Sequence, residues 1–239
     1  MQSYTRHKLK QDRFAETATD AARWAGGHRK TVIWVMGVAV VLAAAVGAWF
    51  AWQAHQSDQA NFALTKALRT ANAQLRAPGE PPQPGVQSFT SGTERGKEAE
   101  KQFKEIADKY SLTKAGKVAL YLAGTSAIQA GDAQTGESLL KTASESRDHD
   151  VAALAKLALA NYYRGVNKQA DAAKIYKDLA DHPTNTVGKA EALLELAEMY
   201  ESSNPQEAAN LYKQIQKENP NTAAAQIAAA KLAGPGAER

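Results

Sequence analysis

One eight-residue pattern recurs four times in this chain and decides its fold: AEKQFKEI (residues 99–106), GESLLKTA (136–143), AAKIYKDL (172–179) and AANLYKQI (208–215). In each copy a small residue is followed four places later by a large one and seven places later by an apolar one. These three positions lie on one face of an α-helix, so each copy predicts a helix with one packing stripe. The copies start 37, 36 and 36 residues apart, and a period of this size indicates a repeat architecture.

Amphipathic stretches between the copies predict the other helix of each repeat. They run over residues 117–131, 151–165 and 189–202, and turn residues such as Gly131-Asp132 and Asn204-Pro205 bound them. The predicted unit is therefore a helix–turn–helix that repeats at about 36 residues. A lysine also follows the large residue of every copy: Lys104, Lys141, Lys177 and Lys213.

The two ends of the array differ from its middle. Residues 53–76 and 93–110 predict a first hairpin, and the Pro/Gly-rich insert between them, 77–92, predicts an exposed loop. The last predicted helix, 221–232, is mostly alanine and has no partner in the sequence. It is therefore interpreted as the cap that closes the array.

Residues 31–52 predict a transmembrane helix. The segment from Val32 to Trp52 has 21 residues and no charge, which corresponds to about 31 Å of helix at about 1.5 Å per residue. A buried core helix and a cleaved signal peptide are the alternatives. The length disfavours a core helix, and the bulky Trp49, Phe50 and Trp52 at the end of the segment disfavour a cleavage site.

The net charge of the chain is concentrated before this segment. Residues 1–30 contain seven basic and three acidic side chains, which accounts for the net charge of +4 of the whole chain. No Lys or Arg occurs between Lys30 and Lys66, so the positive-inside rule predicts a cytoplasmic N-terminus and an extracytoplasmic C-terminal domain. The rest of the chain has no net charge, which argues against a nucleic-acid partner. The predicted organisation is a basic cytoplasmic tail (1–30), a transmembrane helix (31–52), an all-α repeat domain (53–233) and a disordered tail (234–239).

Motifs for catalysis, metals and cofactors are missing from the sequence. There is no cysteine, and the five histidines do not have the three- or four-residue spacing of metal ligands on a helix. Two Ser-x-x-Lys matches, Ser111–Lys114 and Ser138–Lys141, lack the other motifs of penicillin-binding enzymes. Asp148 and Asp150 are interpreted as helix caps rather than as an acid/base pair. We therefore predict no enzyme, no cofactor, no metal and no small-molecule ligand.

The repeat resembles the tetratricopeptide repeat. In its second helix that family has a small, an aromatic and a small residue at this four-and-seven spacing, and a proline follows. Ala208, Tyr212 and Pro220 fit this pattern, whereas Pro183 falls one place early and the first two copies lack the proline. The resemblance implies an all-α fold in which a divergent solenoid of helical hairpins follows the transmembrane helix.

Stacked hairpins form a concave groove that is lined by the first helix of each pair. The candidate peptide-binding residues on these helices are Tyr121, Thr125, Asn161, Arg164 and Glu198. The alternative is that each of them is a solvated or packed residue of the array. Four further large residues are predicted to be part of the core: Tyr162, Tyr163, Met199 and Tyr200.

The basic tail, the single anchor and the neutral repeat domain together resemble the YfgM-type ancillary subunits of the bacterial Sec translocon. The resemblance implies an inner-membrane protein with a periplasmic C-terminal domain beside the SecYEG channel. Its partners would be SecYEG, exported chains and a membrane-anchored periplasmic chaperone such as the PpiD foldase. A cell-envelope scaffold that resembles the division coordinator CpoB is the alternative, and an uncleaved anchor argues against it because CpoB is exported with a cleaved signal.

Overall fold

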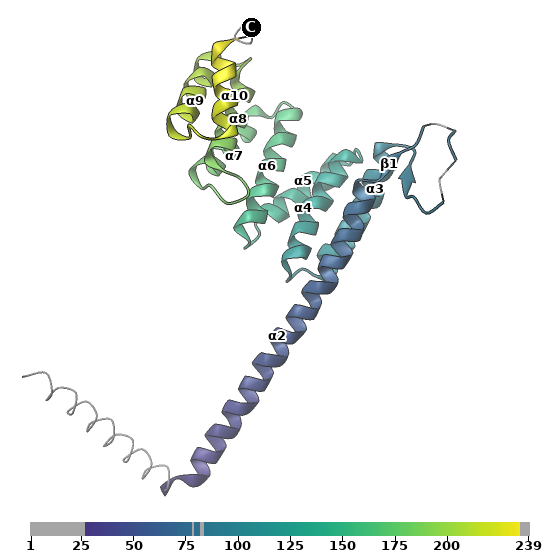
Figure 1. The fold of residues 1–239 in the computed structure, drawn as a ribbon, viewed down its shortest axis with the longest axis vertical. Helices are drawn as coiled ribbons and strands as arrows, with labels where there is room; N and C mark the ends of the chain where they lie inside the picture. Colours follow the sequence, from purple (N-terminus) through teal and green to yellow (C-terminus); the bar gives the residue numbers. More distant parts are fainter. Residues whose placement is uncertain (1–26, 78, 82–83, 235–239) are drawn as a thin grey trace, which may run out of the picture. The chain divides into compact units, whose positions relative to one another are not determined.

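The computed structural model describes residues 27–77, 79–81 and 84–234 (Figure 1). These residues are helical except for turns, loops and one pair of two-residue strands, so the predicted all-α fold is confirmed. The chain divides into two compact units between His55 and Gln56. Most of the predicted cytoplasmic tail, and the predicted tail after Gly234, lie outside the described residues.

The first unit contributes the N-terminal part of helix α2, which runs unbroken from Arg29 to Ala71. An 18-residue window of this helix has a mean hydropathy of 2.3, and none of the window is buried. Trp34 is 75 % exposed and Val41 is 67 % exposed. So much exposed apolar surface is unfavourable in water and argues against a buried core helix. Helix α2 is long and apolar enough to cross a membrane, and the predicted segment 31–52 lies wholly within it.

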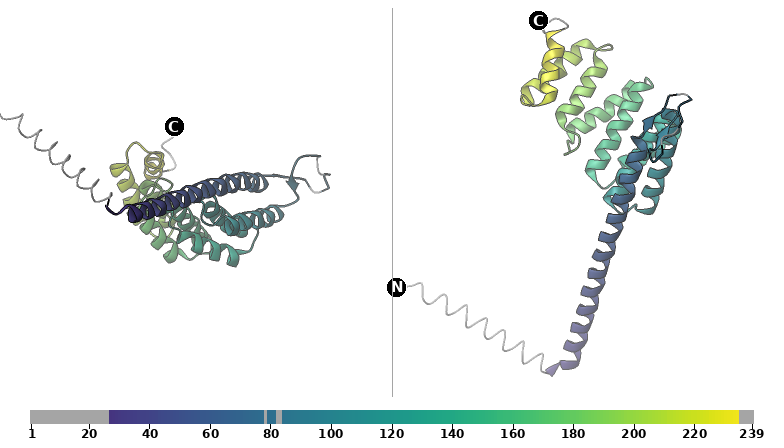
Figure 2. Two further views of the ribbon diagram at one scale, coloured as in Figure 1. Left: turned by 90° about the horizontal axis from the view of Figure 1, so that it is seen from below. Right: turned by 45° about the vertical axis from the view of Figure 1, so that its right-hand side comes forward.

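The second unit is a row of helical hairpins (Figure 2). Each helix packs against the next one in the chain, and α4 also contacts α6 as α8 contacts α10. Contacts limited to near neighbours are typical of a solenoid, which confirms the predicted repeat of helix–turn–helix units. The helices are α3 (Gly92–Lys109), α4 (Lys114–Gln129), α5 (Ala133–Ser144), α6 (His149–Gly165), α7 (Gln169–Asp181), α8 (Lys189–Tyr200), α9 (Pro205–Glu218) and α10 (Ala223–Ala233).

The recurring stripe forms the core of this unit. All of its residues are buried in all four copies, and Phe103 and Tyr176 are among the largest side chains that are fully buried. Complete burial of a large apolar side chain contributes about 1.5–3 kcal/mol, so the stripe explains why the hairpins stack. The four further residues predicted to be core also pack here: Tyr163 and Met199 are buried, and Tyr162 and Tyr200 are partly buried.

Side-chain caps set the start of most of these helices. The side chain at the cap position accepts the backbone N–H three residues later, as an N-cap does. Asp148 is such a cap, as predicted. The prediction for Asp150 is wrong, because its carboxylate accepts the backbone N–H of Asn185 at 3.2 Å and so ties the loop after α7 to the start of α6. The other caps of this type are Ser91, Thr113, Asp132, Asn204 and Thr222.

The C-terminal part of α2, from Gln56 on, belongs to the second unit and packs there against α3, as the predicted first hairpin requires. Ala60 and Ala67 are buried in one cluster with Phe103 and Ile106 of α3. Alanine at these positions lets the two helix backbones approach closely. The predicted pairing of residues 53–76 with the helix that follows the loop therefore forms over the part of α2 that lies in this unit.

The insert between α2 and α3 is closed at its base by a short strand pair. Strand β1 (Gln74–Leu75) pairs in parallel with β2 (Ser88–Phe89), and Phe89 is buried. The Thr70 hydroxyl also donates to Gln87 Oε1 at 3.1 Å. The loop predicted over 77–92 thus contains a strand at its C-terminal end. Two-residue strands have no periodic pattern that a sequence could reveal.

Candidate protein-binding sites

The five residues predicted to bind a peptide lie on the first helices of three successive hairpins. Tyr121 and Thr125 are on α4, Asn161 and Arg164 are on α6, and Glu198 is on α8. The structure brings the α6 and α8 residues together around Tyr176 of α7, where they form a network of polar groups. The two α4 residues are not part of this network. Whether any of them contacts a peptide stays a prediction.

Tyr176 of α7 is the centre of this network. Its side chain is fully buried, and its hydroxyl donates to Asn161 Oδ1 at 2.5 Å. Burial raises the pKa of Tyr176 to about 12, although the nearby Arg164 guanidinium opposes this shift. A buried hydroxyl that lost its acceptor would cost about 1–3 kcal/mol. Asn161 is exposed, but because it accepts the hydrogen bond of the Tyr176 hydroxyl it has a structural role in addition to any role in binding.

An ion pair joins α6 to α8 beside this tyrosine. Arg164 Nη1 donates to Glu195 Oε2 at 2.8 Å, and both side chains are about one third exposed or less. Burial nevertheless raises the pKa of Glu195, and the nearby Glu198 carboxylate adds repulsion. Loss of solvation therefore outweighs the attraction of the guanidinium, as is common in partly buried ion pairs. Arg164 is engaged within the domain.

The two predicted residues on α4 are half-buried. Tyr121 packs against the main core cluster, and its burial raises the pKa of its hydroxyl. The Thr125 hydroxyl donates to the carbonyl oxygen of Leu122 in the same helix at 3.0 Å. Both side chains thus have a role in the fold and still reach the surface.

A Tyr176→Phe variant should lose one tyrosinate that titrates late. The raised pKa means that the neutral hydroxyl is favoured in the folded state. Its contribution to stability is complete below the ordinary tyrosine pKa of about 10 and is lost as the pH rises toward about 12. The measurement is absorbance at 295 nm against pH, compared between the two proteins while the far-ultraviolet spectrum stays unchanged. If the tyrosine that the variant lacks proved to ionise near the ordinary tyrosine pKa, the buried position of Tyr176 would be contradicted.

Sequence reasoning missed a cavity on the opposite face of α6. It has a volume of about 600 Å³ and opens between α5, α6 and α7. Helix α6 lines it with Lys156, Leu159 and Tyr163, which are spaced by three and four residues and share one face. Asn161 points to the other side because successive residues turn by about 100° around the helix axis.

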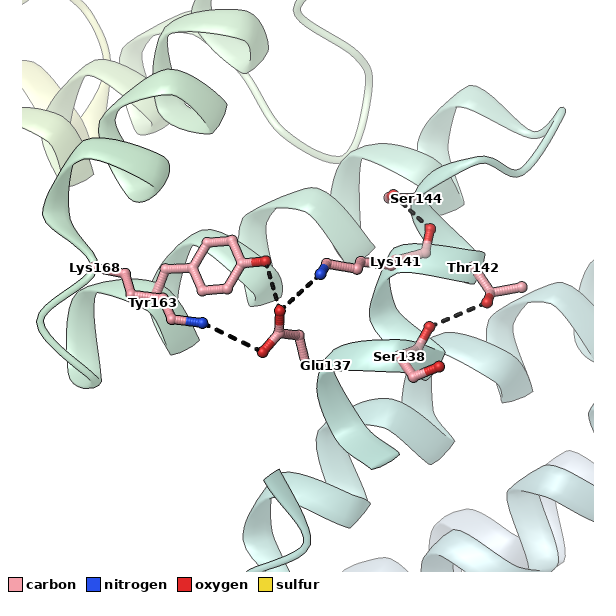
Figure 3. Close-up of polar contacts among 7 residues, drawn as sticks. All are labelled: Glu137, Ser138, Lys141, Thr142, Ser144, Tyr163 and Lys168. Carbon is pink, nitrogen blue, oxygen red and sulfur yellow. Dashed lines mark hydrogen bonds and ion pairs between the residues drawn. The ribbon is translucent and has the colours of Figure 1, made fainter. Parts of the chain in front are cut away.

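Glu137 of α5 connects the walls of this cavity (Figure 3). Its Oε1 accepts from the Tyr163 hydroxyl at 2.9 Å and lies 2.7 Å from Lys141 Nζ, and its Oε2 lies 3.6 Å from Lys168 Nζ. The hydrogen bond from Lys141 is the main cause of the lowered pKa of Glu137. Lys168 Nζ also lies 5.0 Å from the centre of the Tyr163 ring. Glu137 therefore ties α5 to α6 and to the start of α7.

The Ser138-x-x-Lys141 match is not arranged for catalysis. Lys141 Nζ is directed at Glu137, whereas the Ser138 hydroxyl points to a different side of α5 (Figure 3). A serine nucleophile needs its base within hydrogen-bond reach. Of the residues that line the cavity, the sequence patterns single out Lys141, as the recurring lysine, and Tyr163, as a core residue. Tyr163 is part of the core, as predicted, but no sequence pattern indicates that it also lines this cavity.

A Glu137→Gln variant should make the unfolding free energy less sensitive to acid. The pKa of Glu137 is lowered in the folded state, so its stabilising contribution is present above the ordinary carboxyl pKa and is lost as the pH falls through the lowered value. Because the lysine partners are exposed, the expected difference between neutral and acid pH is about 1 kcal/mol or less. The measurement is urea unfolding at several pH values. An unchanged pH dependence would contradict the role of the Glu137 contacts.

A family model described as a tetratricopeptide repeat-like domain matches residues 23–178. The match covers more than half of the chain and extends from before α2 almost to the end of α7. The chain belongs to this tetratricopeptide repeat-like family. Such domains are typically modules that bind other proteins and have no catalytic site. No curated protein and no solved structure matches the chain.

The rest of this tetratricopeptide repeat-like domain follows the same plan. Helices α8 and α9 lie beyond the matched residues, yet Ala208, Tyr212 and Ile215 repeat the buried stripe. Among the described residues, no group of three or more His, Cys, Asp or Glu side chains is placed to hold a metal ion. Two surfaces are thus candidates for protein binding: the surface of α4, α6 and α8 with the five predicted residues, and the cavity between α5, α6 and α7.

Proposed function

We propose that this chain is a membrane-anchored adaptor that binds other proteins through its repeat domain. The observation that carries the proposal is the combination, in one chain, of a tetratricopeptide repeat-like domain with a long helix whose most apolar stretch has no buried residue. An anchor in the same membrane as the partner raises the effective concentration of the binding domain. Weak contacts on the repeat domain would therefore be enough for a useful interaction.

The proposed location is a bacterial inner membrane, with the N-terminus in the cytoplasm and the repeat domain in the periplasm. Arg29 and Lys30 stand at the start of α2, and the next Lys or Arg is Lys66. This asymmetry supports the orientation by the positive-inside rule. The resemblance to YfgM-type subunits supports an ancillary role at the SecYEG translocon, with exported chains or a membrane-anchored periplasmic chaperone as partners.

The orientation can be tested cleanly because the chain contains no cysteine. A single Lys213→Cys variant places one thiol on the exposed face of α9. A membrane-impermeant maleimide should label it in spheroplasts whose inner membrane is intact. Labelling that appears only after lysis would contradict a periplasmic repeat domain.

Photocrosslinking in cells tests the partners. A photoreactive amino acid would replace Glu191, which is exposed on α8 and shares a helix face with Glu198, and in a second variant Trp49 of α2. Asn210, exposed on α9, serves as the control position. Glu191 is chosen over Asn161 because a replacement at Asn161 would remove the acceptor of the Tyr176 hydroxyl.

Crosslinks from Glu191 and Trp49 to translocon subunits or to a membrane-anchored chaperone, and none from Asn210, are the expected result. Crosslinks only to division or peptidoglycan-synthesis proteins would contradict the role at the translocon and favour the envelope scaffold. A complete lack of protein crosslinks from both positions would contradict the adaptor itself.

A further inference from the structure

We propose that the cavity between α5, α6 and α7 is a second protein-binding site, which takes a partner segment with one apolar side chain between two acidic ones. The proposal is independent of the translocon and of the five predicted residues, because the cavity is on the opposite face of α6 from Asn161. A failure of the present proposal would therefore leave the adaptor function standing.

The shape of the cavity suits a short segment of chain. Its volume of about 600 Å³ is within the range of about 300–1,000 Å³ that is usual for sites that enclose a small ligand. Three helices from two successive hairpins form its walls, so it exists only where the repeats stack. A side chain that entered it would contact both repeats at once.

The floor of the cavity is apolar. Leu159 and Tyr163 of α6 are buried, and Ile175 of α7 is half-buried. The Tyr163 hydroxyl is already satisfied by Glu137, so the floor offers no free polar group from this ring. An apolar side chain from a partner would cover the exposed part of Ile175 and would gain free energy mainly by removing its own surface from water.

The rim of the cavity has two basic ends. At the α5 end, Lys141 and Lys168 approach the two oxygens of Glu137 at 2.7 and 3.6 Å. At the other end, Lys156 Nζ lies 2.6 Å from Asp178 Oδ2. Lys174 lies one helical turn before Asp178 on α7 and therefore on the same side of that helix. A carboxylate at each end would find two ammonium groups.

The charges of the rim are not balanced within the chain. Four lysines but only three carboxylates line the cavity. The lysines are Lys141, Lys156, Lys168 and Lys174, and the carboxylates are those of Glu137, Asp171 and Asp178. Among the described residues no carboxylate forms an ion pair with Lys174.

The internal ion pairs leave room for a ligand. The side chains of Lys141 and Lys168 are 56 % and 49 % exposed. Exposed pairs of this kind contribute about 0–1 kcal/mol, and an ammonium group has three donors. An incoming carboxylate can therefore share these lysines without a large penalty. Charge and apolar contact together specify an acidic–apolar–acidic segment.

The test uses the full chain in neutral detergent micelles and a fluorescent peptide, Ser-Gly-Glu-Leu-Glu-Gly-Ser, with both ends blocked. Binding is followed by fluorescence anisotropy at low ionic strength. Two comparison peptides replace both glutamates with glutamine, or the leucine with serine. Both should bind more weakly than the Glu-Leu-Glu peptide. Added salt should reduce the affinity of the Glu-Leu-Glu peptide more than that of the glutamine peptide, because its contacts are between exposed charges.

The decisive variant is Lys174→Gln, which removes a charge without breaking an internal ion pair. An exposed pair worth about 0.2–1 kcal/mol corresponds to a loss of about 1.4- to 5-fold in affinity. Lys174→Glu should weaken binding further, because it adds repulsion. Lys213→Gln is the matched control, since Lys213 is an exposed lysine on the second helix of the next repeat and does not line the cavity.

Unchanged affinity for Lys213→Gln, together with the losses at Lys174, would support the site. The proposal would be overturned if the glutamine peptide bound as tightly as the glutamate peptide. It would also be overturned if Lys213→Gln weakened binding as much as Lys174→Gln, because attraction would then come from the general surface charge. Far-ultraviolet spectra of all variants check that the fold is intact.

Discussion

A Tyr176→Ala variant is expected to lose about 3–5 kcal/mol of unfolding free energy, the range seen when large buried aromatic side chains are truncated. Tyr176 is fully buried in the stripe of α7, and its ring packs in the cluster that α6, α7 and α8 share. The truncation would leave a cavity between two repeats. It would also remove the hydrogen bond to Asn161.

The consequence should extend beyond the site of the mutation. In a solenoid each repeat is stabilised by its neighbours. When one interface is damaged, the repeats on either side of it therefore no longer unfold together. Helices α8 to α10 should then unfold before α3 to α6. Urea unfolding would be measured by circular dichroism. The transition is expected at a lower urea concentration and should be broader, because unfolding is no longer two-state.

Two matched variants separate the ring from the hydroxyl. Tyr176→Phe keeps the ring and should cost about 1 kcal/mol, the usual contribution of one hydrogen bond. Tyr162→Phe removes the hydroxyl of a tyrosine on α6 that is only partly buried, and it should change stability by less than about 0.5 kcal/mol. If Tyr176→Ala cost no more than Tyr162→Phe, the position of Tyr176 at the centre of the stack would be wrong.

A Gly116→Ala variant is expected to lose about 3 kcal/mol, the upper end of the usual cost of overpacking. An added Cβ at Gly116 would lie 2.0 Å from the backbone oxygen and 2.5 Å from the backbone carbon of Tyr110. Both atoms belong to the main chain at the end of α3, so no side chain can move aside. The turn between α3 and α4 would have to open.

Other bonds hold this turn closed. The Thr113 hydroxyl donates to the carbonyl oxygen of Tyr110 at 2.8 Å, and Thr113 Oγ1 accepts the backbone N–H of Gly116 at 3.0 Å. A methyl group at Gly116 would therefore strain the cap of α4 as well as the packing. The measurement is again urea unfolding of the full chain in detergent, compared with the unmodified protein.

Gly165→Ala is the matched control. An added Cβ there meets nothing within 4 Å, and Gly165 is the last residue of α6. Alanine restricts the unfolded chain more than glycine, so this variant should gain about 0.4–1 kcal/mol. Opposite effects of the same substitution at two glycines would show that contact with Tyr110 decides the outcome at Gly116. Equal effects at both positions would contradict the close approach of α3 and α4.

The sequence by itself determined the class of fold and the order of its parts. The stripe positions of every copy, such as Phe103 and Tyr212, could be assigned to the core because burial on a helix follows a period of 3.6 residues. The candidate membrane span could be located because length and composition suffice for it. Both features are local, so each can be seen within a few turns of helix.

Only the tertiary structure decided which polar groups meet. Tyr163 and Glu137 are 26 residues apart, Arg164 and Glu195 are 31 apart, and Asp150 and Asn185 are 35 apart. No periodic pattern connects the members of these pairs. Their contacts depend on the angle and distance at which one hairpin stacks on the next, and these follow from the sum of many side-chain contacts. The same stacking geometry decides that Asn161 and Arg164 form contacts within the domain. It also decides which lysines gather at the rim of the cavity.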